Sequence, residues 1–404
     1  MSVTSNKKRF WWFLFVLGLL FCFYPYEFQD SMFNFLQKEL LTKVFFIIVL
    51  FIILSVGKSV KTPHVLALMV FVHMFGFLLS FVVHGGLGQY IGEYVTIIMV
   101  SLLILVIKDK IGILHFFELY NKWIMIMAIG GCVALMMAIT GIGPIQTFIS
   151  HDLRPAYSWG VSYTNVYYDN FIRYAGFFDE PGAMGYWMVF AIAINRLFIK
   201  NKWVEWGLLV LGLFSFSFGF IVQALVYILL FTFTKRNTVR SIVTAVAVFG
   251  VALFIYNSQG GENSTMYDVT FGRYEKLQEA DQKMGGRQEM SDVAKKYFFA
   301  NPLFGLGRVQ FANIPYYMQD NPYETLAKDG IVGTIYLYFP FLLLLYWGIK
   351  RKDGELIRVW IFMVLSFMHR PFHPAPLYYF IFYSIVYMYY LKMRQPKTLY
   401  EKTA

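Results

Sequence analysis

One arginine of this chain stands in an unusual setting for so apolar a sequence. Residues 173–185 read RYAGFFDEPGAMG, and the chain turns apolar directly afterwards, as YWMVFAIAI. Arg173 therefore lies near Asp179 and Glu180, in a segment whose glycines and proline favour a tight turn of the backbone. The loop around it holds fewer basic residues than carboxylates, so Arg173 is not part of a general basic patch. A guanidinium beside carboxylates, at the mouth of an apolar segment, is a candidate site for chemistry.

A second arginine, Arg287, follows two glycines in the segment GGRQEMSDVAKKYFF. A helix start combines free N–H groups with positive dipole character, so an arginine in its first turn makes a candidate phosphate site. The alternative is a solvated amphipathic helix on the membrane or the bundle, in which Arg287 holds no ligand. The apolar residues that define the helical face are Met290, Val293, Ala294, Tyr297 and Phe298.

Two further polar segments follow, NPLFGLG at 301–307 and DNPYETLAKDGIVG at 320–333. Taken alone, the first predicts a turn, and the DGIVG of the second predicts the end of a helix. Together they place Arg308, Asp320 and Glu324 in a short stretch of chain before another apolar segment. Guanidinium groups neutralise anions and carboxylates accept protons, so this stretch is a second candidate site.

The chain around the first arginine is also rich in aromatic residues, among them Trp159 and Tyr163, and Tyr323 lies in the later segment. Tyrosine and tryptophan are typical of the belt at a membrane interface. The alternative is a surface for sugar rings, whose C–H faces suit aromatic planes. Under that alternative, these three residues are the candidate glycan-binding side chains.

Composition indicates which elements must position these groups. The chain is 58% hydrophobic and only 15% charged, whereas a soluble domain is about half apolar and about a quarter charged. Apolar runs of about 20 residues recur along it, which is typical of membrane-spanning helices. We therefore predict an all-α polytopic membrane protein with about twelve transmembrane helices. The expected spans are 10–24, 40–57, 64–84, 90–107, 122–142, 183–199, 203–217, 218–234, 239–256, 326–349, 356–369 and 376–391.

The net charge of +11 is better explained by membrane topology than by a nucleic-acid partner. With the N-terminus inside, the inner segments carry most of the Lys and Arg residues, as the positive-inside rule requires. Both termini are then cytoplasmic. Residues 1–404 form a single membrane domain with two long outer loops, 143–182 and 257–325, and these loops hold most of the polar chemistry.

The sequence predicts no metal site and no cofactor. Cys22 and Cys132 both lie in apolar spans, where cysteine behaves as a small apolar residue. The histidines are scattered and show neither HxxxH nor HExxH spacing.

In their order and spacing, RxxGFFxEPGxxG, a long loop with a Gly-Arg pair, NPLFGLG and DNPYETLAKDGIVG resemble the O-antigen polymerase (Wzy) and O-antigen ligase superfamily. The resemblance covers about residues 170–340. It implies a membrane glycosyltransferase of the GT-C type, with two long periplasmic loops. The absence of clustered His, Asp and Glu residues in the sequence predicts that its catalysis is metal-independent. Its active site would be periplasmic, in a bacterial inner membrane. The implied substrates are undecaprenyl-diphosphate-linked oligosaccharides in the lipid bilayer. A chain-length regulator and a flippase are candidate partners, and nucleic acid is not one.

The resemblance also implies roles for the three arginines. Arg173 and Arg287, one from each loop, match the arginines that the family uses to bind the donor's diphosphate, and Arg308 is a third candidate. Arginine suits this task because it is always charged and binds phosphate oxygens in a bidentate fork.

Three carboxylates compete for the role of a base that takes the proton of the acceptor hydroxyl. Asp320 occupies the position where the ligases carry a histidine, a departure that favours polymerase over ligase. Glu324 and Glu180 are the other candidates, and Glu180 is alternatively a carboxylate that holds arginines in place.

Two other functions stay open. An O-antigen ligase would transfer the glycan to lipid A core instead of to a second lipid-linked glycan. A transporter of lipid-linked glycans is the alternative of a different class, but ion-coupled transporters place charges within their spans. Here the expected spans are nearly free of charged residues at their centres.

Overall fold

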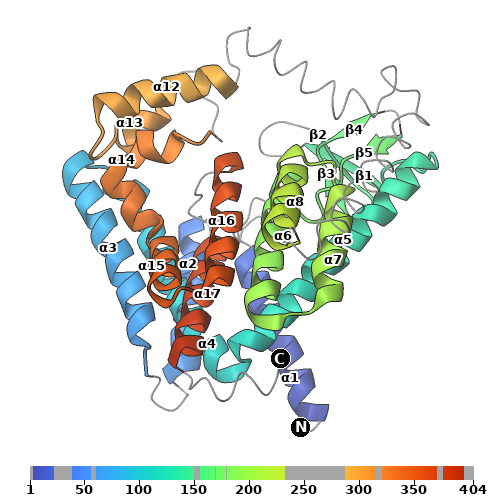
Figure 1. The fold of residues 1–404 in the computed structure, drawn as a ribbon, viewed down its shortest axis with the longest axis horizontal. Helices are drawn as coiled ribbons and strands as arrows, with labels where there is room; N and C mark the ends of the chain where they lie inside the picture. Colours follow the sequence, from blue (N-terminus) through green and yellow to red (C-terminus); the bar gives the residue numbers. More distant parts are fainter. Residues whose placement is uncertain are drawn as a thin grey trace.

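The protein is described by a computed structural model that covers residues 3–21, 39–55, 61–149, 155–168, 170–178, 180–232, 287–314, 321–370 and 376–394. It is mostly helical, as the sequence predicts, and Figure 1 shows the helices packed as a bundle. The helices before the second long loop are α1 (Val3–Phe21), α2 (Glu39–Ser55), α3 (His64–His84), α4 (Leu87–Lys110), α5 (Ile113–Ile139), α6 (Pro181–Ile194), α7 (Lys202–Leu213) and α8 (Phe218–Phe231). Those after it are α12 (Arg287–Ala300), α13 (Arg308–Ala312), α14 (Glu324–Leu337), α15 (Phe339–Arg351), α16 (Gly354–His369) and α17 (Pro376–Arg394).

Several of these helices are long and apolar enough to cross a membrane. Among the described residues they are His64–His84, Tyr90–Asp109, Ile113–Ile139 and Pro181–Ile199, with the bent pair of α14 and α15 as a fifth candidate. The structure is thus consistent with a helical membrane protein. The twelve-span count and the GT-C architecture stay predictions, and the expected span at 239–256 lies outside the described residues.

The span expected at 326–349 corresponds to two helices, α14 and α15. The chain bends by 47° between α14 and α15, at Tyr338, two residues before Pro340. Proline has no N–H group and clashes with the preceding turn, so it starts a new helix here instead of continuing the old one.

The expected break between the spans 203–217 and 218–234 is confirmed, in the segment SFSFG. α7 ends at Leu213 and α8 begins at Phe218. Between them Phe216 adopts a positive φ of 49°, and its ring contacts that of Phe171 in the first long loop, with centroids 5.0 Å apart.

The prediction of an all-α chain needs a correction in the first long loop, which folds partly as two small sheets. β1 (Gln146–Ile149), β2 (Pro155–Ser158) and β3 (Tyr163–Thr164) form one antiparallel sheet in sequence order. β4 (Tyr167–Tyr168) and β5 (Phe171–Ile172) form a second antiparallel pair. Strands of two to four residues are too short to show an alternating pattern in an aromatic-rich sequence.

The centre of the bundle is occupied by α6 and by most of α17. Every residue of α6 is buried, as are Pro376–Tyr387 of α17. A helix that is apolar on all sides is stable only when other helices surround it, so α6 is an internal helix of the bundle.

The far end of α6 is fixed by polar contacts. A short π-helix, η2 (Asn195–Ile199), follows α6, and the buried Asn195 side chain donates a hydrogen bond to the carbonyl of Asn201 at 2.8 Å. The next residue, Arg196, forms ion pairs with Glu205 of α7 and Glu355 of α16, both at 3.1 Å. Three helices are therefore tied to one arginine at this end of the bundle.

The polar segments lie at the opposite end. Figure 1 shows α12 and α13 on one side and the strands on the other side of the same end of the bundle, while α1 reaches toward the opposite end. We call the end with α12 and the strands the loop end. The described parts of both long loops thus lie at the same end of the bundle, whereas their side of a membrane stays a prediction.

Candidate functional site

Arg173 is held at the loop end by the backbone of β3. Two residues after Arg173 in the chain bind the backbone of Tyr163. The N–H of Ala175 donates to the Tyr163 carbonyl at 2.9 Å, and the N–H of Tyr163 donates to the Gly176 carbonyl at 2.7 Å. The hydroxyl of Thr164 donates to the Arg173 carbonyl. The Arg173 side chain is only 7% exposed, so its position is set by the folded loop.

The aromatic residues that follow Arg173 anchor this turn in the helices. Tyr174 is fully buried and its hydroxyl donates to the carbonyl of Leu211 in α7. Phe178 stacks on Trp187 of α6. Gly176 has a φ of +64°, and a Cβ atom built there would lie 3.1 Å from the sulfur of Met184. The segment RYAGFF is therefore a docked turn that requires glycine at this position.

Glu180 ends the turn and forms an ion pair with Arg370, the residue that follows α16. Both side chains keep some access to solvent, 29% for Glu180 and 16% for Arg370. Of the two roles considered for Glu180, the structure supports the carboxylate that holds an arginine. That arginine is Arg370, which the sequence did not single out.

The proposed glycan-binding residues fall into different settings. Trp159 is only 2% exposed, and its indole N–H donates to the Ile142 carbonyl at 3.0 Å. The Trp159 ring is therefore not presented to a sugar in this structure. Tyr163 and Tyr323 are partly exposed and keep some accessible surface. Most aromatic side chains of the first loop contact one another and form the loop's own core.

The two later motifs are joined by their backbones. The N–H groups of Leu306 and Gly307 donate to the carbonyls of Ala327 and Lys328, at 2.8 and 2.9 Å. In return, the N–H groups of Ile331 and Val332 donate to Pro302 and Leu303, at 2.9 and 3.0 Å. The turn NPLFGLG thus pairs with the AKDGIV segment of α14, which opens at this point. We call this unit the paired motif.

Glycines make this pairing sterically possible. Gly330 interrupts α14 with a φ of +65°, and a Cβ atom there would lie 2.4 Å from the carbonyl oxygen of Leu303. Gly305 has a φ of +72°, and a Cβ atom there would lie 2.5 Å from the Lys328 carbonyl oxygen. No larger residue fits at either position without moving backbone.

Arg308, which follows the turn, is part of a buried charge cluster. It forms ion pairs with Glu93 of α4 and with Asp329 of α14, the latter at 2.9 Å. Burial works against its charged form, but the negative charge of Asp329 raises the pKa of Arg308 above its ordinary value. The structure therefore gives Arg308 the role of a brace between helices, in place of the diphosphate ligand that the sequence suggested.

The start of α14 holds another candidate. Glu324 is buried and forms an ion pair with Lys328 one turn later. Asp320 lies outside the described residues. Arg287 is the first residue of α12, as expected, but its side chain is also outside the described part.

The amphipathic helix expected for this segment is α12, and its apolar face packs on α13 and α14. Ala294 forms a small buried cluster with Phe311 of α13 and Ala327 of α14. Arg287 is thereby placed at the start of a helix that is fixed against the paired motif.

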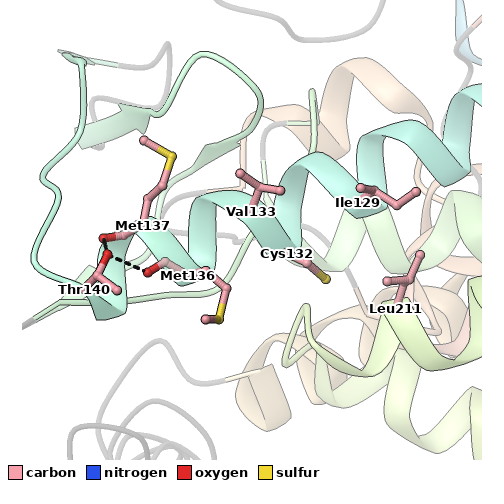
Figure 2. Close-up of a pocket in the computed structure, with 7 residues that line it drawn as sticks. All are labelled: Ile129, Cys132, Val133, Met136, Met137, Thr140 and Leu211. Carbon is pink, nitrogen blue, oxygen red and sulfur yellow. Dashed lines mark hydrogen bonds between the residues drawn. The ribbon is translucent and has the colours of Figure 1, made fainter.

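An apolar pocket lies beside the docked turn, between α5 and α7 (Figure 2). Its volume is about 380 Å³. The hydroxyl of Thr140 is turned back onto the carbonyls of Met136 and Met137, so the pocket offers a hydrocarbon surface. The lining residues are Ile129, Cys132, Val133, Met136, Met137, Thr140 and Leu211. Leu211 also accepts the hydrogen bond of Tyr174, the neighbour of Arg173.

Sequence reasoning missed four charged residues of this end: Glu93, Lys328, Asp329 and Arg370. Arg370 had a local signal, because HRPFHPAP interrupts two apolar spans. Glu93 and Asp329 are acidic residues near one end of an apolar segment, and this position was the feature that could have identified them. Among the described residues, no group of three or more His, Cys, Asp or Glu side chains is placed to hold a metal ion.

Comparison with known protein families, with curated proteins and with solved structures finds no match for this chain. A function can therefore be proposed only from the residues and geometry of the chain itself.

We predict that Arg308→Met destabilises the protein strongly. The substitution leaves Glu93 and Asp329 buried without their cation, which typically costs about 3–5 kcal/mol. The measurement is the midpoint of thermal unfolding of the purified protein in detergent.

The control is Arg351→Met, at an exposed position in the last turn of α15, where we expect little change. Adding Asp329→Asn to Arg308→Met should recover part of the loss, because one uncompensated charge is removed. An Arg308→Met protein that unfolds at the wild-type temperature would contradict the role of Arg308 as a brace.

Proposed function

We propose that this protein is a metal-independent glycosyltransferase that polymerises undecaprenyl-diphosphate-linked oligosaccharide repeat units. The reaction would take place at the periplasmic face of a bacterial inner membrane and yield O-antigen or a related surface polysaccharide. The observation that carries the proposal is the paired motif, because the turn NPLFGLG and the helix segment AKDGIV bind each other through four backbone hydrogen bonds. Two segments that resemble the same family are thus one structural unit, at the same end of the bundle as the Arg173 turn (Figure 1).

The chemistry of this reaction has three requirements. The departing diphosphate must be neutralised, the sugar must be oriented, and the acceptor hydroxyl must lose its proton. Arg173, buried and fixed by the docked turn, and Arg287, at the start of α12, suit the first requirement. The apolar pocket between α5 and α7, next to the turn that carries Arg173, suits a hydrocarbon chain attached to the diphosphate.

The proton of the acceptor hydroxyl requires a base. Glu324 is held by Lys328, so a role as base would require this ion pair to open when substrate binds. Asp320 stands where the related ligases carry a histidine, which favours polymerisation over ligation.

The distribution of charge does not favour transport. Glu93 lies in the second turn of α4, and Asp329 lies in the second turn of α14. The charge cluster around Arg308 therefore belongs to the loop end and not to the middle of the spans, where coupling residues of transporters lie.

Deletion of the gene in a lipopolysaccharide-producing host tests the proposal. We expect lipopolysaccharide whose core carries a single repeat unit, because ligation continues without polymerisation. A bare core would indicate a ligase instead. Normal long-chain lipopolysaccharide and normal capsule in the deletion strain would contradict both activities.

Arg173→Lys and Arg287→Lys should each lose most polymerising activity. Lysine keeps the charge but is a point donor, whereas arginine offers a planar fork that matches two phosphate oxygens. The measurement is the length of the polymer on gels after complementation, at equal protein levels in the membrane. Arg351→Lys, at an exposed position in the last turn of α15, serves as the matched control. Full-length polymer from either loop variant would refute its role.

Asp320→Asn or Glu324→Gln should slow polymerisation by about 10²–10⁴-fold, the usual contribution of a general base. Each substitution keeps the shape of the side chain and removes its charge. The measurement is the rate of polymer formation by purified protein, alongside binding of the donor. The residue that serves as base should lose rate while donor binding is retained. Near wild-type rates in both variants and in the double variant would place the base elsewhere.

A further inference from the structure

One ion pair connects the docked turn of the first loop to a distant element. Arg370 directly follows α16, and its backbone N–H still donates to the Ser366 carbonyl at 2.9 Å. With a φ of −134°, its backbone has left the helix. Its Nη2 contacts Oε1 of Glu180, the residue that precedes α6. A guanidinium that is remote in sequence is thus brought to the turn that carries Arg173.

Glu180 uses only part of the hydrogen-bonding capacity of Arg370. A guanidinium has five N–H donors in a fixed planar fork. The described part of the chain gives the Arg370 side chain no hydrogen-bonding or charged partner except Glu180. The side chain is 16% exposed, so it combines a position fixed by Glu180 with an edge that solvent can reach.

The helices beneath this ion pair provide an apolar and rigid support. Phe367, one turn before Arg370 in α16, is 7% exposed. It packs against Tyr186 and Phe190 of α6, with ring centroids 6.1 Å apart in both pairs. Hydrogen bonds and charge interactions are stronger beside such apolar surfaces than in water. An anion bound by Arg370 would therefore gain more than it would at an open surface.

We propose that Arg370 is a further ligand of the substrate's diphosphate, and that Glu180 is the residue that positions it. This inference rests on the proposed function and deepens it. Arginine binds phosphate oxygens through two parallel N–H groups, and one carboxylate neutralises only part of what a diphosphate requires. Glu180 keeps the guanidinium at the turn when the site is empty, and the diphosphate binds the donors that Glu180 leaves unused.

The test compares the two partners of the same ion pair. Binding of undecaprenyl diphosphate to purified protein in detergent is measured for wild type, Arg370→Gln and Glu180→Gln, with Arg351→Gln as the control far from the site. We expect Arg370→Gln to weaken binding about tenfold to a hundredfold, the loss typical of hydrogen bonds to a charged group. Glu180→Gln should weaken binding less than Arg370→Gln does, because the guanidinium fork remains and only the carboxylate that positions it is lost.

A purely structural role predicts a different outcome. Both variants break the same ion pair, so equal losses of binding in Arg370→Gln and Glu180→Gln would overturn the inference. If Arg370→Gln lowers the unfolding temperature, Arg370→Lys provides the second measurement, because lysine keeps the ion pair but lacks the fork. Arg370→Lys should then unfold like wild type and still bind undecaprenyl diphosphate at least about fivefold more weakly. Binding as tight as wild type would overturn the inference.

Two further ligands identify the source of the phosphate. Inorganic diphosphate should compete with undecaprenyl diphosphate for wild type and compete less well for Arg370→Gln. Vesicles of phosphatidylglycerol should not distinguish the two proteins, and a loss seen only with these vesicles would overturn the inference. A wild-type protein that binds no undecaprenyl diphosphate would overturn the proposed function and the inference together. Wild-type binding that Arg370→Gln retains in full would overturn the inference alone.

Discussion

The loop end of this protein depends on satisfying backbone groups where the chain leaves its helices. A polar backbone group without a partner costs free energy wherever water is excluded. The turn NPLFGLG has neither a helix nor a sheet of its own, and its N–H and carbonyl groups bind instead to α14, which opens at Gly330 to receive them. This exchange brings Arg308 to Glu93 and Asp329, and through them it ties α13 and α14 to α4. The packing of α12 on α13 and α14 then follows from the same contact.

The first loop solves the same problem in a different way. Its turn is held by a short antiparallel bridge between Tyr163 and Gly176 and by buried aromatic rings that reach into the helices. Neither loop relies on a disulfide or a metal among the described residues. Both present an arginine next to a glycine-dependent turn, one at Arg173 and one at Arg308. The difference is that Arg308 is matched by two carboxylates from other helices, so its charge serves the fold.

The sequence predicts the helices well because their apolar runs are long and regular. The span expected at 64–84 matches α3 residue for residue, and the turn between α7 and α8 was visible in SFSFG. The bend at Tyr338 was missed because Pro340 lies inside an apolar run, where composition alone shows no break. The strands were missed because they are too short to show a period. The partners of Arg308 and Arg370 could not be predicted at all, since an ion pair between residues far apart in sequence leaves no local pattern.

The polar contacts at the C-terminal end of α6 have a consequence for the loop end, where this helix begins. Asn195 and Arg196 lock the base of this helix to α7 and α16, and neighbouring helices cover it on every side. A helix that is held by ion pairs at one end and packed on all sides cannot slide or rotate without breaking contacts with several neighbouring helices at once. The turn that carries Arg173 is docked on the same frame, because Tyr174 is hydrogen-bonded to α7 and Phe178 stacks on α6. The position of Arg173 at the loop end is therefore coupled to the contacts at the opposite end of α6.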